Sequence, residues 1–147
     1  MDMECIIEAR AAATDHHDGD LGPDISNLRA NGWLTACLPR QARGCGWGTQ
    51  PHGIADAFDA SRAIGRSNLS VARLFEGHMN AVKLVTLYAS EQLREETYAA
   101  VWDRAPLGLW SADDPDKSLT IESATHRMHG SKRFASGLVS CTAPSYR

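Results

Sequence analysis

The sequence contains no apolar run long enough to cross a membrane. Its 147 residues include no stretch of about 18 consecutive apolar residues, whereas a membrane-spanning helix needs about 20. The first twenty residues also lack the positive charge with which signal and transit peptides begin, since Arg10 is the sole basic residue among them. From these two absences we expect a cytoplasmic protein that does not bind membranes.

Basic clusters and paired cysteines are also missing. The formal net charge is −3, and the four Lys and Arg residues of segment 124–147 are dispersed, which argues against nucleic-acid binding. The four cysteines form no CxxC pair and no zinc-finger spacing. We therefore expect no disulfide framework, and free, mostly buried thiols at Cys5, Cys37, Cys45 and Cys141.

Several catalytic motifs are absent, and the remaining polar clusters each have a structural alternative. The sequence has no GxSxG elbow, no phosphate-binding P-loop and no GxGxxG after a strand. The segment HHD at 16–18 could hold a metal, but adjacent histidines point in different directions and a solvated loop is favoured. The aspartates at 113, 114 and 116 could bind calcium but lack the EF-hand spacing. His78 lies in an apolar segment, where a hydrogen-bonded core histidine is commoner than a catalytic base.

Hydrophobic periodicity predicts a mainly helical chain up to Pro106. Residues 69–90 are apolar around most of a helix circumference, so this helix is expected to be enclosed. Asp24 is a candidate N-cap, Gly32 a helix stop, and Ser67 and Asn68 are good caps before residue 69. Segment 33–53, rich in glycine and proline, is predicted to be a long ordered loop. Helices are expected over 3–13, 24–32, 53–64, 69–90 and 91–103. The apolar face of the helix over 53–64 is expected to consist of Ile54, Ala57, Phe58, Ser61 and Ile64.

After Pro106 the pattern changes to short alternating segments separated by Asp, Pro, Gly and Ser. These segments are typical of strands, with a loop at 112–118 and a hairpin turn at 129–132. Helices followed by strands predict an α+β fold. We expect an N-terminal helical domain over 1–105 and, over 106–147, a few antiparallel strands of an incomplete β-barrel domain. The predicted strands lie within 107–112, 118–124, 126–136 and 138–141.

In this order the segments resemble the front part of an acyl-CoA dehydrogenase, from about Gly32 to Ser140. "NGWLTACLP" and "RGCGWG" are similar to the family's early glycine-rich passage, and "RSNLSVARLFEGHMNAVKLVTLYAS" with "EQLREETYAAVWDRAPLGLW" resembles its long helix, the next helix and the start of its middle β-domain. "GLWSADDP" resembles a cofactor loop, and "MHGSKRFASG" matches a strand of that domain. Within the family, the likeness is to the branch related to flavin-dependent desulfurisation monooxygenases, in which phenylalanine replaces the usual tryptophan.

The resemblance implies an FAD site. Phe134 would pack against the flavin ring, and Ser136 would hydrogen-bond its reactive nitrogen or a neighbouring oxygen. Residues two apart on a strand face the same way, so both could meet one ligand; the alternative for Phe134 is a core aromatic. The second lining segment would be Trp110, Ser111, Ala112 and Asp113. Here the chain departs from the family, which often has threonine and glutamate where this sequence has Asp113 and Asp114.

The resemblance also implies an activity that these residues do not complete. The family oxidises acyl-CoA thioesters at a CH–CH bond, with a glutamate base from a C-terminal helical bundle that does not fit in the residues after Ser140. We therefore expect an N-terminal segment from a truncated gene, inactive alone, with no catalytic residue assigned. The alternative is a non-catalytic helical module that binds a partner or itself through exposed apolar helix surface. The substrate, and dehydrogenase or monooxygenase ancestry, stay open.

Overall fold

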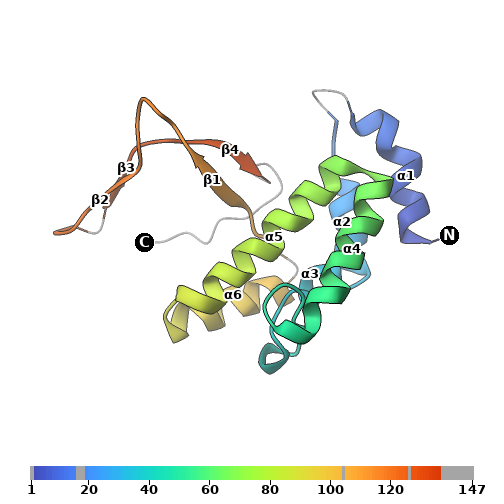
Figure 1. Cartoon of the computed structure of the whole chain (residues 1–147), viewed down its shortest axis with the longest axis horizontal. Helices are drawn as coiled ribbons and strands as arrows, with labels where there is room; N and C mark the ends of the chain where they lie inside the picture. Colours follow the sequence, from blue (N-terminus) through green and yellow to red (C-terminus); the bar gives the residue numbers. More distant parts are fainter. Residues whose placement is uncertain (1, 16–18, 104, 126, 137–147) are drawn as a thin grey trace.

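The computed structural model describes residues 2–15, 19–103, 105–125 and 127–136. Within these residues, six α-helices come first and four strands follow, which confirms the predicted α+β fold. In Figure 1 the helices form a body, and the strands form an arm that extends from it. The helices are α1 (Met3–Thr14), α2 (Gly22–Ala30), α3 (Trp33–Ala36), α4 (Ile54–Ser67), α5 (Leu69–Tyr88) and α6 (Glu91–Trp102), and the strands are β1 (Leu109–Asp113), β2 (Thr120–Glu122), β3 (Arg127–His129) and β4 (Lys132–Ser136). None of the helices in the described residues is long and apolar enough to cross a membrane.

The helical core is built around α5, which packs against α4 and also contacts α3 and α6. Phe75 of α5 is fully buried and meets the edges of Trp33 and Trp47, with ring centroids 5.9 and 6.4 Å away. The two tryptophan rings are themselves 5.5 Å apart in a T-shaped arrangement, a favoured geometry for aromatic pairs. Trp47 lies in the predicted loop, so this segment contributes to the core. It is also not a pure loop, because α3 and the 3₁₀ turns Arg40–Ala42 and Pro51–Gly53 lie within it.

The end signals of α2 were only partly predicted. Gly32 has a φ of 75° and its N–H donates to the Arg29 carbonyl at 3.1 Å, as expected of a glycine after a helix. Asp24 is not the N-cap, because α2 begins at Gly22 and Asp24 lies inside its first turn. Its carboxylate is buried and accepts a hydrogen bond from Nε of Arg10 in α1 at 3.1 Å. Asp24 therefore joins two helices, which a capping rule cannot foresee.

The predicted apolar face of α4 was wrong in two of its five positions. Ala57, Ala60 and Ile64 are buried, but Ile54 and Phe58 are 60% and 62% exposed. The small alanines allow α4 to lie close to α1 and α5, so the contact face is turned toward Ala60 and away from Phe58. The exposed Phe58 ring instead lies 5.7 Å from the Arg62 guanidinium.

Helix α5 is only partly enclosed, contrary to the sequence prediction. Val71, Phe75 and Val82 are buried, whereas Leu84, Leu87 and Tyr88 near its C-terminus are 45%, 59% and 80% exposed. The helix starts as predicted at Asn68, whose side chain accepts hydrogen bonds from the backbone N–H groups of Ser70 and Val71. Ser67 belongs to α4 instead.

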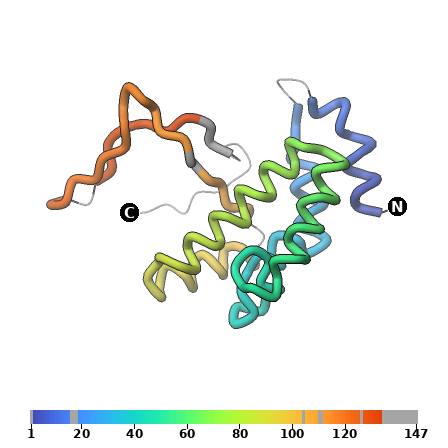
Figure 2. Tube along the Cα trace, viewed as in Figure 1, coloured from blue at the N-terminus to red at the C-terminus, as the bar shows by residue number. Residues whose placement is uncertain are grey.

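The strands pair as one bent antiparallel ribbon made of two short sheets. β1 pairs with β4, and β2 pairs with β3; the tube in Figure 2 shows both halves of the ribbon running along the arm. Residues 129–132 were predicted to form a hairpin turn, but they connect β3 to β4, which are not partners. The chain reverses between β2 and β3 instead. The predicted strand at 138–141 lies outside the described residues.

Two of the cysteines are not buried as predicted. Cys5 and Cys45 are exposed, Cys37 is buried, and all three are free; Cys141 lies outside the described residues. Burial raises the pKa of the Cys37 thiol to about 12, with Cys45 as a smaller cause. Cys37 therefore stays a protonated core residue and not a nucleophile at neutral pH.

Candidate functional site: the paired strands at the base of the arm

The two segments that the sequence predicts to bind a flavin are hydrogen-bonding partners. Leu109 pairs with Ser136, Trp110 with Ala135, Ala112 with Arg133, and Asp113 with Lys132. Segment 110–113 therefore lies directly beside segment 132–136, although a loop, a hairpin and two strands separate them in sequence. This ladder lies at the base of the arm, where both β1 and β4 contact α5.

Backbone alternation divides the six predicted residues between the two faces of the ladder. In antiparallel strands, directly paired residues share a face and successive residues alternate. Positions 134 and 136 therefore share one face with 111 and 113, whereas positions 110 and 112 lie on the other face. The side chains of Trp110, Ser111, Phe134 and Ser136 lie outside the described side chains.

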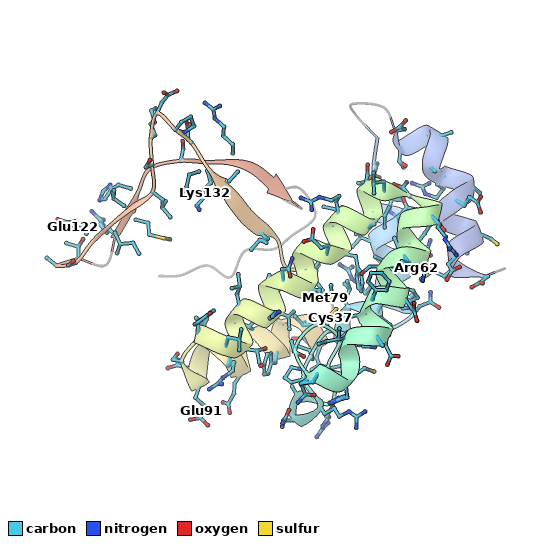
Figure 3. All side chains as sticks on the ribbon, in the orientation of Figure 1. Cys37, Arg62, Met79, Glu91, Glu122 and Lys132 are labelled. Carbon is cyan, nitrogen blue, oxygen red and sulfur yellow. The ribbon has the colours of Figure 1, made fainter. Side chains whose placement is uncertain are left out.

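Asp113 and Lys132 form an ion pair on the first of these faces. The Asp113 carboxylate lies 2.7 Å from Lys132 Nζ, and the two residues are direct cross-strand partners. Figure 3 labels Lys132 on the arm, away from the helical body. The carboxylate that was predicted to line the cofactor site is thus neutralised by a neighbouring cation.

The Asp114 side chain connects the loop that follows β1 to the start of β4 through hydrogen bonds. Its carboxylate accepts hydrogen bonds from Ser131 Oγ at 2.7 Å, from the backbone N–H of Asp116 at 3.1 Å, and from Arg133 at 3.2 Å. The Ser131 hydroxyl, then the Asp116 N–H, lower the pKa of this carboxyl, and the guanidinium adds to them. Sequence reasoning missed the roles of Ser131 and Arg133, although both lie within the "MHGSKRFASG" stretch.

The acidic loop does not have the character of a metal site. Asp114 is the middle one of the three aspartates at 113, 114 and 116. Its carboxylate already accepts hydrogen bonds from Ser131, from the Asp116 N–H and from Arg133. Within the residues that the structure describes, no group of three or more His, Cys, Asp or Glu side chains could hold a metal ion. The HHD segment at 16–18 lies outside the described residues.

His78 fixes the segment that leads into β1. The imidazole is buried; Nδ1 accepts the backbone N–H of Leu107 at 3.0 Å, and Nε2 lies 3.0 Å from the Leu34 carbonyl. Because an N–H donor requires a bare Nδ1, the ring proton is on Nε2, which donates to Leu34. Burial lowers the pKa of His78 to about 4. This is the core-histidine alternative, and both ring nitrogens are already used.

Comparison with known proteins adds no relative. No family model matches the sequence, and a search of curated proteins finds no significant match.

Proposed function

We propose that the chain is the N-terminal segment of an acyl-CoA dehydrogenase-like flavoprotein and that the β1–β4 ladder is its flavin contact. The observation that carries the proposal is the pairing of segment 110–113 with segment 132–136. The resemblance assigns both segments to one ligand, and their pairing places them side by side, as a shared ligand requires. The substrate class by this resemblance is an acyl-CoA thioester, and the segment alone is inactive.

The register of the ladder supports a flavin contact on one face. Positions 134 and 136 are neighbours on that face, and position 111 shares it, so the aromatic residue and the two hydroxyl residues at these positions belong to the same side of the ladder. The Asp113–Lys132 pair closes the same face at one end without leaving a net negative charge beside the ligand. When bound, FAD would supply the hydride acceptor for thioester oxidation; the chain's own part is to hold and orient the ring.

Titration of FAD with the purified chain tests this proposal. We expect visible flavin absorbance in the purified protein, or saturable quenching of flavin fluorescence on mixing. Ser136→Ala should weaken FAD binding roughly fivefold, which corresponds to the loss of one hydrogen bond. Ser123→Ala, in the turn after β2, is the matched control and should leave binding unchanged. A chain that binds no FAD, or equal binding by both variants, would contradict the proposal.

The second candidate is a module that associates with a second copy of itself. It is favoured by the exposed side chains of Leu84, Leu87 and Tyr88, which lie three and four positions apart and so share one face of α5. On the arm, Ile121 and Met128 are also exposed and are direct cross-strand partners. A colourless, stably dimeric protein would support this candidate against the flavoprotein.

A further inference from the structure

Helix α6 has, besides its buried side, a face that lines a cleft. Thr97 and Val101 are its buried residues. Five other residues face a cleft of about 930 Å³, whose opposite wall is formed by Pro39, Gln41, Ala42, Arg43, Thr49 and Gln50. In sequence order these are Glu91, Arg94, Glu95, Tyr98 and Trp102. Figure 3 labels Glu91 at the end of the helical body, remote from the arm.

Hydrogen bonds fix the aromatic walls of this cleft. The Trp102 indole N–H donates to the Ala42 carbonyl at 2.9 Å, yet the residue is 46% exposed. Tyr98 Oη lies 2.9 Å from Thr86 Oγ1. Because the threonine hydroxyl donates to the Val82 carbonyl, the tyrosine is the donor in this pair. Both rings are therefore held in place without a ligand, which lowers the entropic cost of binding one.

The opposite wall is also ordered by side-chain amides. Gln50 Nε2 donates to Gln41 Oε1 at 2.9 Å, and Gln50 Oε1 accepts the backbone N–H of Arg40 at 3.0 Å. These contacts hold the loop as one unit across from α6. Together with the fixed rings, they make the cleft a preformed feature of the fold.

The charges around the cleft are balanced in sign and are not paired with one another. Two cations, Arg43 and Arg94, and two carboxylates, Glu91 and Glu95, line it. Among the described residues none of these four takes part in an ion pair, although Arg62 and Arg73 on α4 and α5 do. The Arg94 guanidinium makes one long contact, 3.4 Å to the Thr86 carbonyl. Because unpaired charges of both signs line one cleft, a ligand that carries both charges can pair with each of them.

We propose that this cleft binds a small zwitterion of the amino-acid class with an aromatic side chain. Its carboxylate would pair with Arg94 and its ammonium group with Glu91, three positions earlier along α6. Residues three or four apart on a helix are separated by about 5–6 Å at Cβ, which suits two charges on one α-carbon. Tyr98 and Trp102, one and two turns further on, would hold the aromatic ring.

Titration with L-phenylalanine, followed through the Trp102 indole N–H signal in ¹H–¹⁵N spectra, tests the proposal. We expect a saturable shift below about 10 mM. N-acetyl-L-phenylalaninamide carries the same ring without either charge, and it should bind at least tenfold more weakly. No saturable shift would overturn the proposal, as would equal binding of the blocked compound, which would leave only an aromatic contact.

Two glutamates of α6 provide a matched pair of variants. Glu91→Gln should weaken L-phenylalanine binding about fivefold, since a charge-assisted hydrogen bond is lost. Glu96→Gln alters a glutamate of the same helix that does not line the cleft and contacts Gln92; it should leave binding unchanged. Thermal unfolding of both variants verifies that they are folded. Equal effects of the two substitutions would contradict the assigned ammonium site.

Discussion

At the residue scale, His78 makes stability depend on pH. Burial lowers its folded-state pKa to about 4 from an ordinary 6.5, so between these values the unfolded chain binds a proton that the folded chain does not. Stability is therefore full above about pH 6.5 and falls as the pH drops toward 4, by about 3 kcal/mol from this group. Urea unfolding at pH 7, 5.5 and 4.5 measures the loss. An NMR titration of His78 with an ordinary pKa in the folded protein would contradict it.

The same residue gives a mutational prediction. His78→Phe keeps the apolar volume but leaves the Leu107 N–H and the Leu34 carbonyl without their partners inside the core. We expect a loss of about 2–5 kcal/mol in the free energy of unfolding, because two buried polar groups become unsatisfied. His129→Phe, at an exposed position on the arm, is the control and should change stability by less than about 0.5 kcal/mol. Equal losses would mean that the hydrogen bonds of His78 contribute nothing.

Sequence patterns identified which of these residues are special but not their partners. A histidine in an apolar helix is expected to be buried, and His78 is. Its partners, however, lie 44 and 29 residues away, and no local pattern specifies contacts at such separations. The same limit explains why the prediction of Asp24 as a helix N-cap was wrong. A capping rule considers only the helix itself, whereas Asp24 pairs with Arg10, 14 residues earlier.

At the element scale, Asn68 joins the start of α5 to the end of α1. Its Oδ1 accepts the N–H groups of Ser70 and Val71, and its Nδ2 donates to Thr14 Oγ1 at 2.7 Å in a buried contact. Asn68→Ala should cost about 2 kcal/mol in chemical denaturation, the upper end of the range for a helix cap. Ser90→Ala removes the cap of α6, which makes a single exposed hydrogen bond of 3.3 Å, and should cost less than half as much. The reverse order of the two losses would contradict this ranking.

A second element-scale prediction concerns the loop that Asp114 holds. Asp114→Ala removes the acceptor shared by Ser131, Arg133 and the Asp116 N–H. We expect faster amide hydrogen exchange at Asp116 and Ser131 with little change in the helices, because the loop opens locally. Lys117→Ala, at an exposed position of the same loop, is the control. Unchanged exchange in the Asp114 variant would mean that the ladder alone orders the loop.

The helices could be predicted more fully than the strands. The apolar repeat and the cap residues that predict a helix lie within or next to that helix. Five helices therefore occur close to where the sequence places them. Strand pairing depends on segments that lie far apart in the sequence. The short segments after Pro106 could be recognised as strands, but the turn at Gly130, predicted to be a hairpin, joins β3 to β4, which are not partners. The face of α4 was wrong for a related reason, since two alanines and not the larger Phe58 decide which side packs.

At the scale of the whole molecule, the helical body and the arm differ in how they are stabilised. The body has a continuous apolar core from α1 to α6, whereas β2 and β3 are exposed along their length. Two-stranded ribbons are marginally stable in water unless something packs on them. The base of the arm has such support from α5, but β2 and β3 have no comparable helix contact among the described residues, and Ile121 and Met128 are exposed there.

The exposed end of α5 leads to the final prediction, a concentration-dependent dimer. Leu84, Leu87 and Tyr88 form an apolar face that a second copy can cover, since such surface gains about 25 cal/mol per Å² on burial. Sedimentation equilibrium should show a dimer that Leu87→Gln weakens at least tenfold. Leu69→Gln changes another exposed leucine, at the opposite end of α5, and should have no effect. A monomeric wild-type chain at about 100 μM, which would put any Kd far above the micromolar range, or equal effects of the two variants, would contradict self-association through this face.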